Sequence, residues 1–110
     1  MSEKPVTLAD RFAIQKLFKT GERIGRRPLL VIFKKNDLGY NRYLYCPDKT
    51  CPSAVTRNKV KRLLRVHVRE FNPKLYKGLD LGFVTSVSFV KLSFQERNLM
   101  ITKTLSRFLQ

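Results

Sequence analysis

The sequence predicts an α+β fold in which helices pack on one small β-sheet. Segments with apolar residues at helical spacing alternate with short runs of β-branched and aromatic residues. Their order along the chain is helix, strand, strand, helix, strand, helix, which is typical of an α+β domain. Of the 110 residues, 43% are hydrophobic and 11% are aromatic. Such a chain can build one modest core, so we predict a single domain over residues 1–110.

The first helix is predicted over residues 7–20. Thr7 is followed by Asp10 three positions later, a spacing that resembles a capping box. Leu17 belongs to a set of apolar residues at helical spacing, and Gly21 provides a natural C-terminal stop. The helix therefore has a start signal, an apolar face and an end signal.

Two strands are predicted next, and we expect them to pair as a hairpin. The basic run 23–27 contains a glycine and is predicted to be a loop. Residues 28–34 are apolar and partly β-branched, which indicates a buried strand. Turn-forming residues at 35–39 separate it from a second strand at 40–46.

The second half of the chain begins with the longest predicted helix, over residues 53–71. Ser53 is the expected N-cap, and Pro73 ends the helix because the residue before a proline avoids helical angles. A third strand region is predicted over residues 81–90, followed by a final helix over residues 93–109.

The charge balance points to an anionic partner. There are 23 Lys and Arg residues against 8 Asp and Glu, which gives a formal net charge of +15 and a pI near 10.4. Such an excess favours nucleic acid or an anionic membrane. No apolar run approaches the ~18–20 residues of a membrane span, and no apolar signal core follows the N-terminus. We therefore expect a cytoplasmic protein with Cys46 and Cys51 reduced.

The helix over 53–71 concentrates this charge on one side. At ~100° per residue its basic residues cover roughly 140° of the surface, opposite an apolar side. An ordinary solvated face carries pairs of opposite charge, whereas this face repeats like charges at i, i+4, each pair costing about 0.2–0.5 kcal/mol. Bound phosphates would turn this unfavourable repulsion into a favourable interaction. The basic side carries Arg57, Asn58, Lys61, Arg62, Arg65 and Arg69.

Residues 54–65 resemble the signature helix of the bacterial ribonuclease P protein subunit. That pattern is Ala-Val, any residue, Arg-Asn-Arg, an aliphatic, Lys-Arg, two aliphatics and Arg, and only Lys59 departs from it. The resemblance extends along nearly the whole chain. Departures are the loop 47–52, where a lysine is lost and Asp48 gained, and Val66 in place of a usual Glu. Further matching positions are Phe12, Phe18, Gly21, Arg42, Lys49, Gly78 and Asp80.

The resemblance implies a fold like the second domain of ribosomal protein S5, with a left-handed βαβ crossover. It implies a catalytic RNA subunit that cleaves the 5′ leader from precursor tRNA with Mg²⁺, and a protein that assists without catalytic or metal-binding residues of its own. The implied contacts with the RNA subunit are Arg57, Asn58, Lys59, Lys61, Arg62, Arg65 and Arg69. The expected contacts with the leader are Phe12, Phe18, Phe33, Arg42, Tyr45 and Lys49.

Other interpretations stay open at this point. Phe12, Phe18 and Phe33 fit core packing as well as they fit base stacking. The composition equally suits a structural RNA-binding or ribosomal protein. A DNA-binding regulator would need specific duplex contacts and usually a dimer interface, and nothing in the sequence suggests either. We expect neither DNA nor a membrane as a partner. A self-sufficient nuclease would need clustered carboxylates, and the aspartates are scattered.

Overall fold

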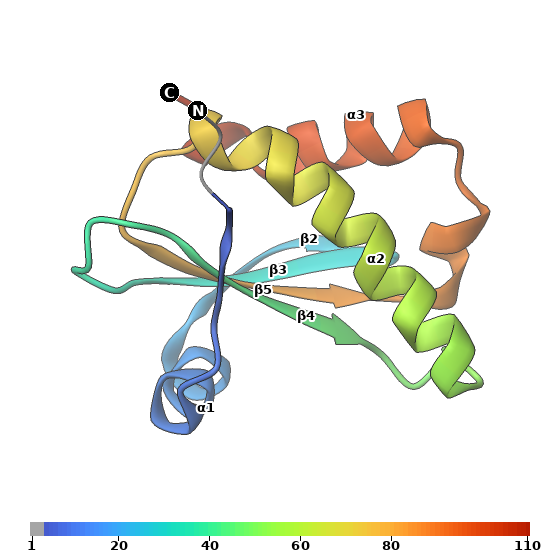
Figure 1. Ribbon diagram of the computed structural model, residues 1–110, viewed down its shortest axis with the longest axis horizontal. Helices are drawn as coiled ribbons and strands as arrows, with labels where there is room; N and C mark the ends of the chain where they lie inside the picture. Colours follow the sequence, from blue (N-terminus) through green and yellow to red (C-terminus); the bar gives the residue numbers. More distant parts are fainter. Residues whose placement is uncertain (1–3) are drawn as a thin grey trace.

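The computed structural model describes residues 4–110, and within them a five-stranded sheet is flanked by three α-helices (Figure 1). The α+β class predicted from the sequence is confirmed. The strands are β1 (Val6–Thr7), β2 (Glu22–Arg26), β3 (Leu29–Lys35), β4 (Arg42–Pro47) and β5 (Leu79–Thr85). The helices are α1 (Arg11–Thr20), α2 (Ala54–Phe71) and α3 (Phe94–Thr104). Short 3₁₀ turns cover Asn72–Lys74, Val87–Lys91 and Ser106–Phe108.

The strand order is β1-β4-β5-β3-β2, and it corrects two predictions. The predicted pairing of residues 28–34 with 40–46 is wrong, because β5 lies between β3 and β4 and bonds to both. The predicted loop at 23–27 is also wrong, because β2 pairs antiparallel with β3, with Ile24 opposite Val31. The hairpin of this fold is therefore β2–β3. Its first strand is an exposed edge, which explains its polar sequence.

The chain passes from β4 through α2 to β5, and these two strands are parallel neighbours. In Figure 1, α2 lies in front of the sheet, both strands point to the right, and β5 lies above β4. This arrangement is a left-handed crossover, against the strong right-handed preference of βαβ units. The crossover carries the basic helix across the sheet next to β4.

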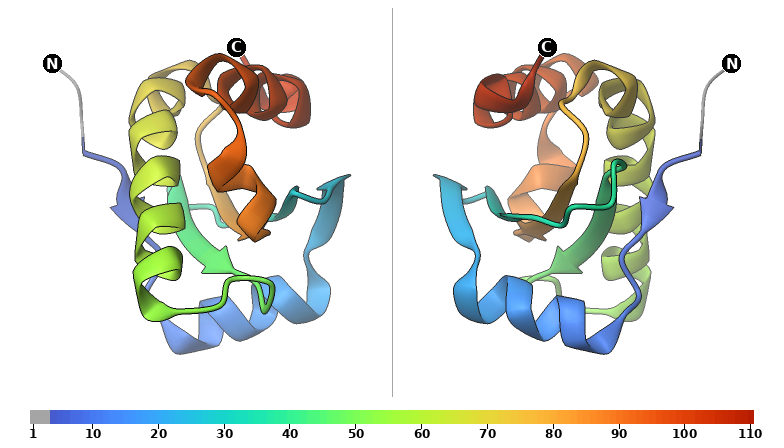
Figure 2. Two further views of the ribbon diagram at one scale, coloured as in Figure 1. Left: turned by 90° about the vertical axis from the view of Figure 1, so that its right-hand side faces the viewer. Right: turned by 90° about the vertical axis from the view of Figure 1, so that its left-hand side faces the viewer.

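Helices α2 and α3 lie on one side of the sheet and α1 lies on the other (Figure 2). Alternate strand residues contribute to two apolar clusters, one on each side. Val31 and Phe33 point to the side covered by α2 and α3, where the larger cluster lies. Ile32 points to the other side and packs with Leu17 of α1. We therefore distinguish the α2 side from the α1 side of the sheet.

The N-terminal helix is shorter than predicted. Asp10, rather than Thr7, is its N-cap, because the Asp10 carboxylate accepts a hydrogen bond from the Phe12 amide at 3.0 Å. Thr7 belongs to β1, which pairs with β4. Gly21 ends the helix as predicted, since its amide donates to the Leu17 carbonyl and an added Cβ would clash with that oxygen.

The C-terminal region contains the predicted strand and helix with changed ends. The strand β5 stops at Thr85, and the remainder of the predicted segment 81–90 is mostly a 3₁₀ turn. Helix α3 starts after Ser93, which forms a reciprocal capping box with Glu96, and ends at Thr104 instead of residue 109. Across residues 4–110, no helix combines the length and the apolar character that a membrane crossing requires.

Candidate nucleic-acid interface

Helix α2 forms as the sequence predicts and is fixed to the sheet by its apolar stripe. Its N-cap Ser53 accepts a hydrogen bond from the Thr56 amide at 3.2 Å. Val60, Leu64 and Val68 recur at i, i+4 and i+8, and all three are buried in the larger cluster. Burial of this stripe leaves the opposite side of the helix facing solvent.

That opposite side is a cationic surface without internal neutralisation. Within residues 4–110, the ion pairs join Arg27 to Asp48 and Arg42 to Asp80, so no cation of α2 has an acidic partner there. The basic side chains therefore neither turn inward nor pair with acids of the described chain. We call these residues the α2 surface: half-buried Lys61 and the exposed Arg57, Asn58, Lys59, Arg62, Arg65 and Arg69.

Tyr45 lies against this surface. The guanidinium carbon of Arg65 is 5.4 Å from the centre of the Tyr45 ring, which also stacks on Phe83. Burial raises the pKa of Tyr45 to about 12, although the positive charge of Arg65 opposes that rise. Tyr45, Arg65, Arg69 and Lys4 line one small pocket beside β1. The structure thus groups Tyr45 with the residues expected to contact the RNA subunit.

The α1 side carries two of the expected leader contacts on its helix. Phe12 is 80% exposed and Phe18 is 37% exposed, so neither ring is a core side chain. Lys16 and Lys19 are exposed on the same helix, and Lys16, Lys19 and Phe12 line a shared hollow. The sequence analysis did not assign Lys16 and Lys19 to this surface. Their place beside Phe12 can be recognised only when the exposed face of α1 is known.

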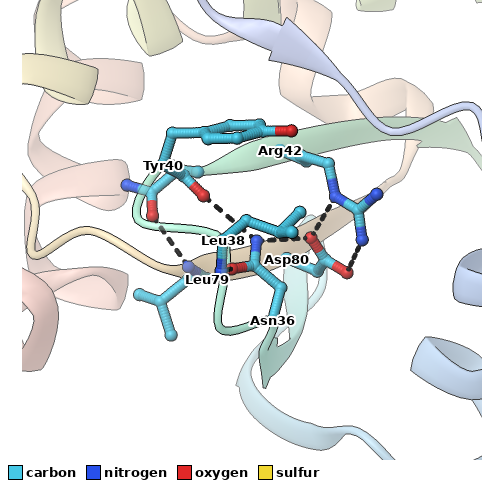
Figure 3. A network of polar contacts seen from close by, with 7 residues as sticks. Asn36, Leu38, Tyr40, Arg42, Leu79 and Asp80 are labelled. Carbon is cyan, nitrogen blue, oxygen red and sulfur yellow. Dashed lines mark hydrogen bonds and ion pairs between the residues drawn. The ribbon is translucent and has the colours of Figure 1, made fainter.

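Arg42 faces the α1 side but is held by an acid. Its guanidinium donates to both carboxylate oxygens of Asp80, each at 2.8 Å, as Figure 3 shows. The hydrogen bonds with Asp80 raise the pKa of Arg42 above its ordinary value. Asn36 donates to the same carboxylate at 2.9 Å. The two hydrogen bonds therefore hold the Arg42 guanidinium in one orientation.

Phe33 lies apart from the α1 aromatics. It is 8% exposed, points to the α2 side of the sheet, and packs edge-on against Phe108 with ring centres 4.8 Å apart. The side chain of residue 33 alternates with that of Ile32, which faces α1. Phe33 therefore faces the side of the sheet opposite to α1, which carries Phe12 and Phe18.

Lys49 is exposed in the loop before α2, where the sequence gains Asp48. Burial pushes the pKa of Asp48 upward, but hydrogen bonds from Ser86 and Thr50 outweigh it and hold that pKa below its usual range. The Ser86 hydroxyl donates to Asp48 at 2.6 Å. The acid therefore fixes the loop. Lys49 shares a hollow with Arg26 and Arg27, two cations that the loop prediction for 23–27 left unassigned.

Within residues 4–110, no three His, Cys, Asp or Glu side chains gather into a group that could hold a metal ion. Asp48 and Asp80, the acids that form ion pairs, are occupied by hydrogen bonds. His67 lies on the buried face of α2, where desolvation and the charge of Arg97 lower its pKa. These groups have the surroundings of structural side chains.

Known proteins match this chain over most of its length. A "Ribonuclease P protein component" from Borrelia garinii subsp. bavariensis is 33% identical over 98 residues, covering 86% of this chain and 87% of that protein. One from Syntrophomonas wolfei is 30% identical over 95 residues, covering 86% and 80%. The RNase P protein structure from Thermotoga maritima matches with a TM-score of 0.82 at 24% identity, covering 94% and 98%.

The structural match shows the fold, and the sequence matches confirm the resemblance seen in the signature helix. The family model "Ribonuclease P" matches residues 3–109. On this combined support, the chain belongs to the ribonuclease P protein family.

Proposed function

We propose that this chain is the RNA-binding protein subunit of ribonuclease P and that its α2 surface contacts the catalytic RNA. Membership of the family makes the chain a protein component of an endoribonuclease. The observation that carries the proposal is the cationic α2 surface, which has no acidic partner within residues 4–110 and is seated on the sheet by a mainly apolar stripe. Phosphates would neutralise its like charges, and Arg presents donors that match phosphate oxygens bidentately.

We further propose that the α1 side contacts the 5′ leader of precursor tRNA. The exposed rings of Phe12 and Phe18 offer stacking surfaces for unpaired bases, and Lys16 and Lys19 offer charge for the backbone. Arg42 lies on the same side, held by Asp80. Phe33 and Tyr45 lie on the other side of the sheet, so a leader confined to the α1 side would not reach them.

In this proposal the protein acts by electrostatics and positioning. Its cations would reduce the repulsion between two RNAs and hold the scissile bond in register. The carboxylates of residues 4–110 do not form a donor set for Mg²⁺, so we assign the metal ions of the family's reaction to the RNA subunit. We place the assembly in the cytoplasm, where precursor tRNA is made in bacteria.

Reconstitution tests the proposal. Purified protein is added to a bacterial ribonuclease P RNA at low Mg²⁺, and precursor-tRNA cleavage is followed. We expect stimulation by the wild-type chain, little by the Arg57→Ala/Lys61→Ala/Arg65→Ala variant, and no cleavage by the protein without RNA. Failure to stimulate, together with recovery of ribosomal RNA from cells by the tagged protein, would favour a structural RNA-binding role instead.

A further inference from the structure

A second aromatic and basic hollow lies apart from the α2 surface, at the end of α1, where Thr20 lines it. It is formed where β3 ends and β5 begins, and it extends to the C-terminal 3₁₀ turn. Its apolar lining comes from Phe33, Leu79 and Phe108, and its volume is about 570 Å³. That size lies within the range of ~300–1,000 Å³ that is usual for ligand pockets. We call it the C-terminal groove.

The rim of this groove is positively charged. Lys34, Lys35 and Lys77 line it with a single acid, Glu22. The Lys34 ammonium donates to the Thr20 hydroxyl at 3.1 Å, which holds it at the rim. The Lys77 ammonium donates to a backbone carbonyl at 3.3 Å and keeps further donors available. The groove therefore combines an apolar floor with a rim that favours an anion.

Tyr76 gives the groove an exposed aromatic ring. It is 57% exposed, whereas the floor rings Phe33 and Phe108 are each 8% exposed. The guanidinium carbon of Arg107 lies 5.4 Å from the centre of the Phe33 ring and adds a further cation nearby. Proteins that bind single-stranded nucleic acid combine aromatic rings, on which bases stack, with cations that contact the phosphates. The exposed Tyr76 ring beside three lysines has this combination.

The backbone around Tyr76 is fixed before any ligand arrives. Asn41 donates to the Tyr76 carbonyl at 2.9 Å and accepts from the Leu79 amide at 2.8 Å. Asn36 and Asp80 hold the adjoining turn, as Figure 3 shows. The Tyr76 amide also donates to the Phe108 carbonyl at 2.8 Å. This side-chain network ties three separate segments together and limits the ordering cost of binding.

We propose that the C-terminal groove binds a single-stranded RNA segment, with one base stacked on Tyr76 and neighbouring phosphates on Lys34, Lys35 and Lys77. The site goes beyond the proposed α2 and α1 contacts, because its lining shares no residue with them. Phe33, which the sequence grouped with Phe12 and Phe18, forms part of its floor. We assign RNA rather than an acidic peptide, because the exposed Tyr76 ring among three lysines offers base stacking together with phosphate contact.

The test uses the full chain and a labelled five-nucleotide oligouridine, measured by fluorescence anisotropy and by amide chemical shifts. Tyr76→Ala should weaken binding about fivefold or more, whereas Tyr76→Phe should bind as the wild type does. Lys34→Ala/Lys77→Ala should lower the log–log salt slope by roughly 0.7 per lost phosphate contact. Tyr40→Ala, a half-exposed tyrosine of the neighbouring turn outside the groove, is the matched control and should change nothing.

Two results would overturn the proposal. One is oligouridine binding that Tyr76→Ala leaves unchanged, with no shift of the amides at 33–35 and 76–77. The other is equally tight, Tyr76-dependent binding of an acidic peptide of the same charge. Either result can be distinguished from failure of the proposed function. That function is tested separately, by comparing how the wild-type chain and the Arg57→Ala/Lys61→Ala/Arg65→Ala variant stimulate the catalytic RNA.

Discussion

The two sides of the sheet present basic residues in opposite ways. On the α2 side the cations project from an exposed helix face and have no acidic partner within residues 4–110. On the α1 side the half-buried Arg42 is bound to Asp80 by two hydrogen bonds, and the exposed groups include the rings of Phe12 and Phe18.

This difference separates two physical contributions to RNA binding. Unpaired exposed cations bind phosphates through counterion release, which depends strongly on salt and weakly on sequence. Exposed rings on a rigid scaffold bind unpaired bases by stacking, which depends much less on charge. Mutations on the α2 side should therefore change RNA affinity and leave folding intact. Mutations in the Arg42–Asp80 network should mainly lower the free energy of unfolding.

The largest expected effect is on stability, from Asp80→Ala. It leaves the mostly buried Arg42 without its acid and Asn36 without an acceptor, and such a loss costs about 3 kcal/mol. Urea denaturation measures the free energy of unfolding. Arg42→Ala/Asp80→Ala should recover part of the loss, because it removes the unpaired charge as well. A loss below about 0.5 kcal/mol for Asp80→Ala would mean that the network does not hold the α1 side together.

The second effect is on leader binding, from Phe12→Ala. Because the ring is 80% exposed, the free energy of unfolding should change by less than about 0.5 kcal/mol. Loss of one stacked base should weaken binding of leader-bearing precursor tRNA by about 1–2 kcal/mol. Leaderless tRNA is the matched ligand, and its affinity should stay constant. Equal losses for both ligands would place Phe12 outside the leader contact.

A pH effect of intermediate size is expected from the loop that precedes α2. Because hydrogen bonds hold the pKa of Asp48 low in the folded protein, its contribution is complete above the unfolded pKa of ~3.9. It is lost as the pH falls through the lower folded value. Asp48→Asn should cost about 1.5 kcal/mol at pH 7 and progressively less below about pH 4. Parallel stability curves for the two proteins would contradict the depressed pKa.

The smallest effect concerns the stability of α2 itself. Arg57, Lys61 and Arg65 form two like-charge pairs at i, i+4, each costing about 0.2–0.5 kcal/mol. Replacing all three with alanine should therefore leave the free energy of unfolding unchanged or raise it by up to about 1 kcal/mol. Thermal unfolding at low salt shows the difference best. Destabilisation by more than 1 kcal/mol would show that these cations support the fold.

Local patterns in the sequence were sufficient for α2. Its cap at Ser53, its apolar stripe and its basic side all lie within one continuous segment, so the helix and its surface could be predicted together. Residues 22–26 gave no such signal, because the strand β2 is polar and exposed and forms only through pairing with β3. The order of the sheet was equally hidden, since β5 enters between β3 and β4 from the far end of the chain.

The grouping of the aromatic residues also depended on nonlocal structure. The sequence could not show that Phe33 and Tyr45 face the α2 side while Phe12 and Phe18 face solvent on the α1 side. That separation follows from strand register and from which helix covers each side. Local patterns thus predicted the α2 surface, whereas only the assembled sheet shows where a leader could run and reveals the C-terminal groove.

The central claim is that unpaired cations of α2 hold a folded RNA. Affinity for a bacterial ribonuclease P RNA, measured against salt concentration, tests it most directly. The Arg57→Ala/Lys61→Ala/Arg65→Ala variant should bind more weakly, with a log–log slope reduced by about 2–3, as expected for three lost phosphate contacts at roughly 0.7–0.9 each. An unchanged slope in a folded variant would contradict the account.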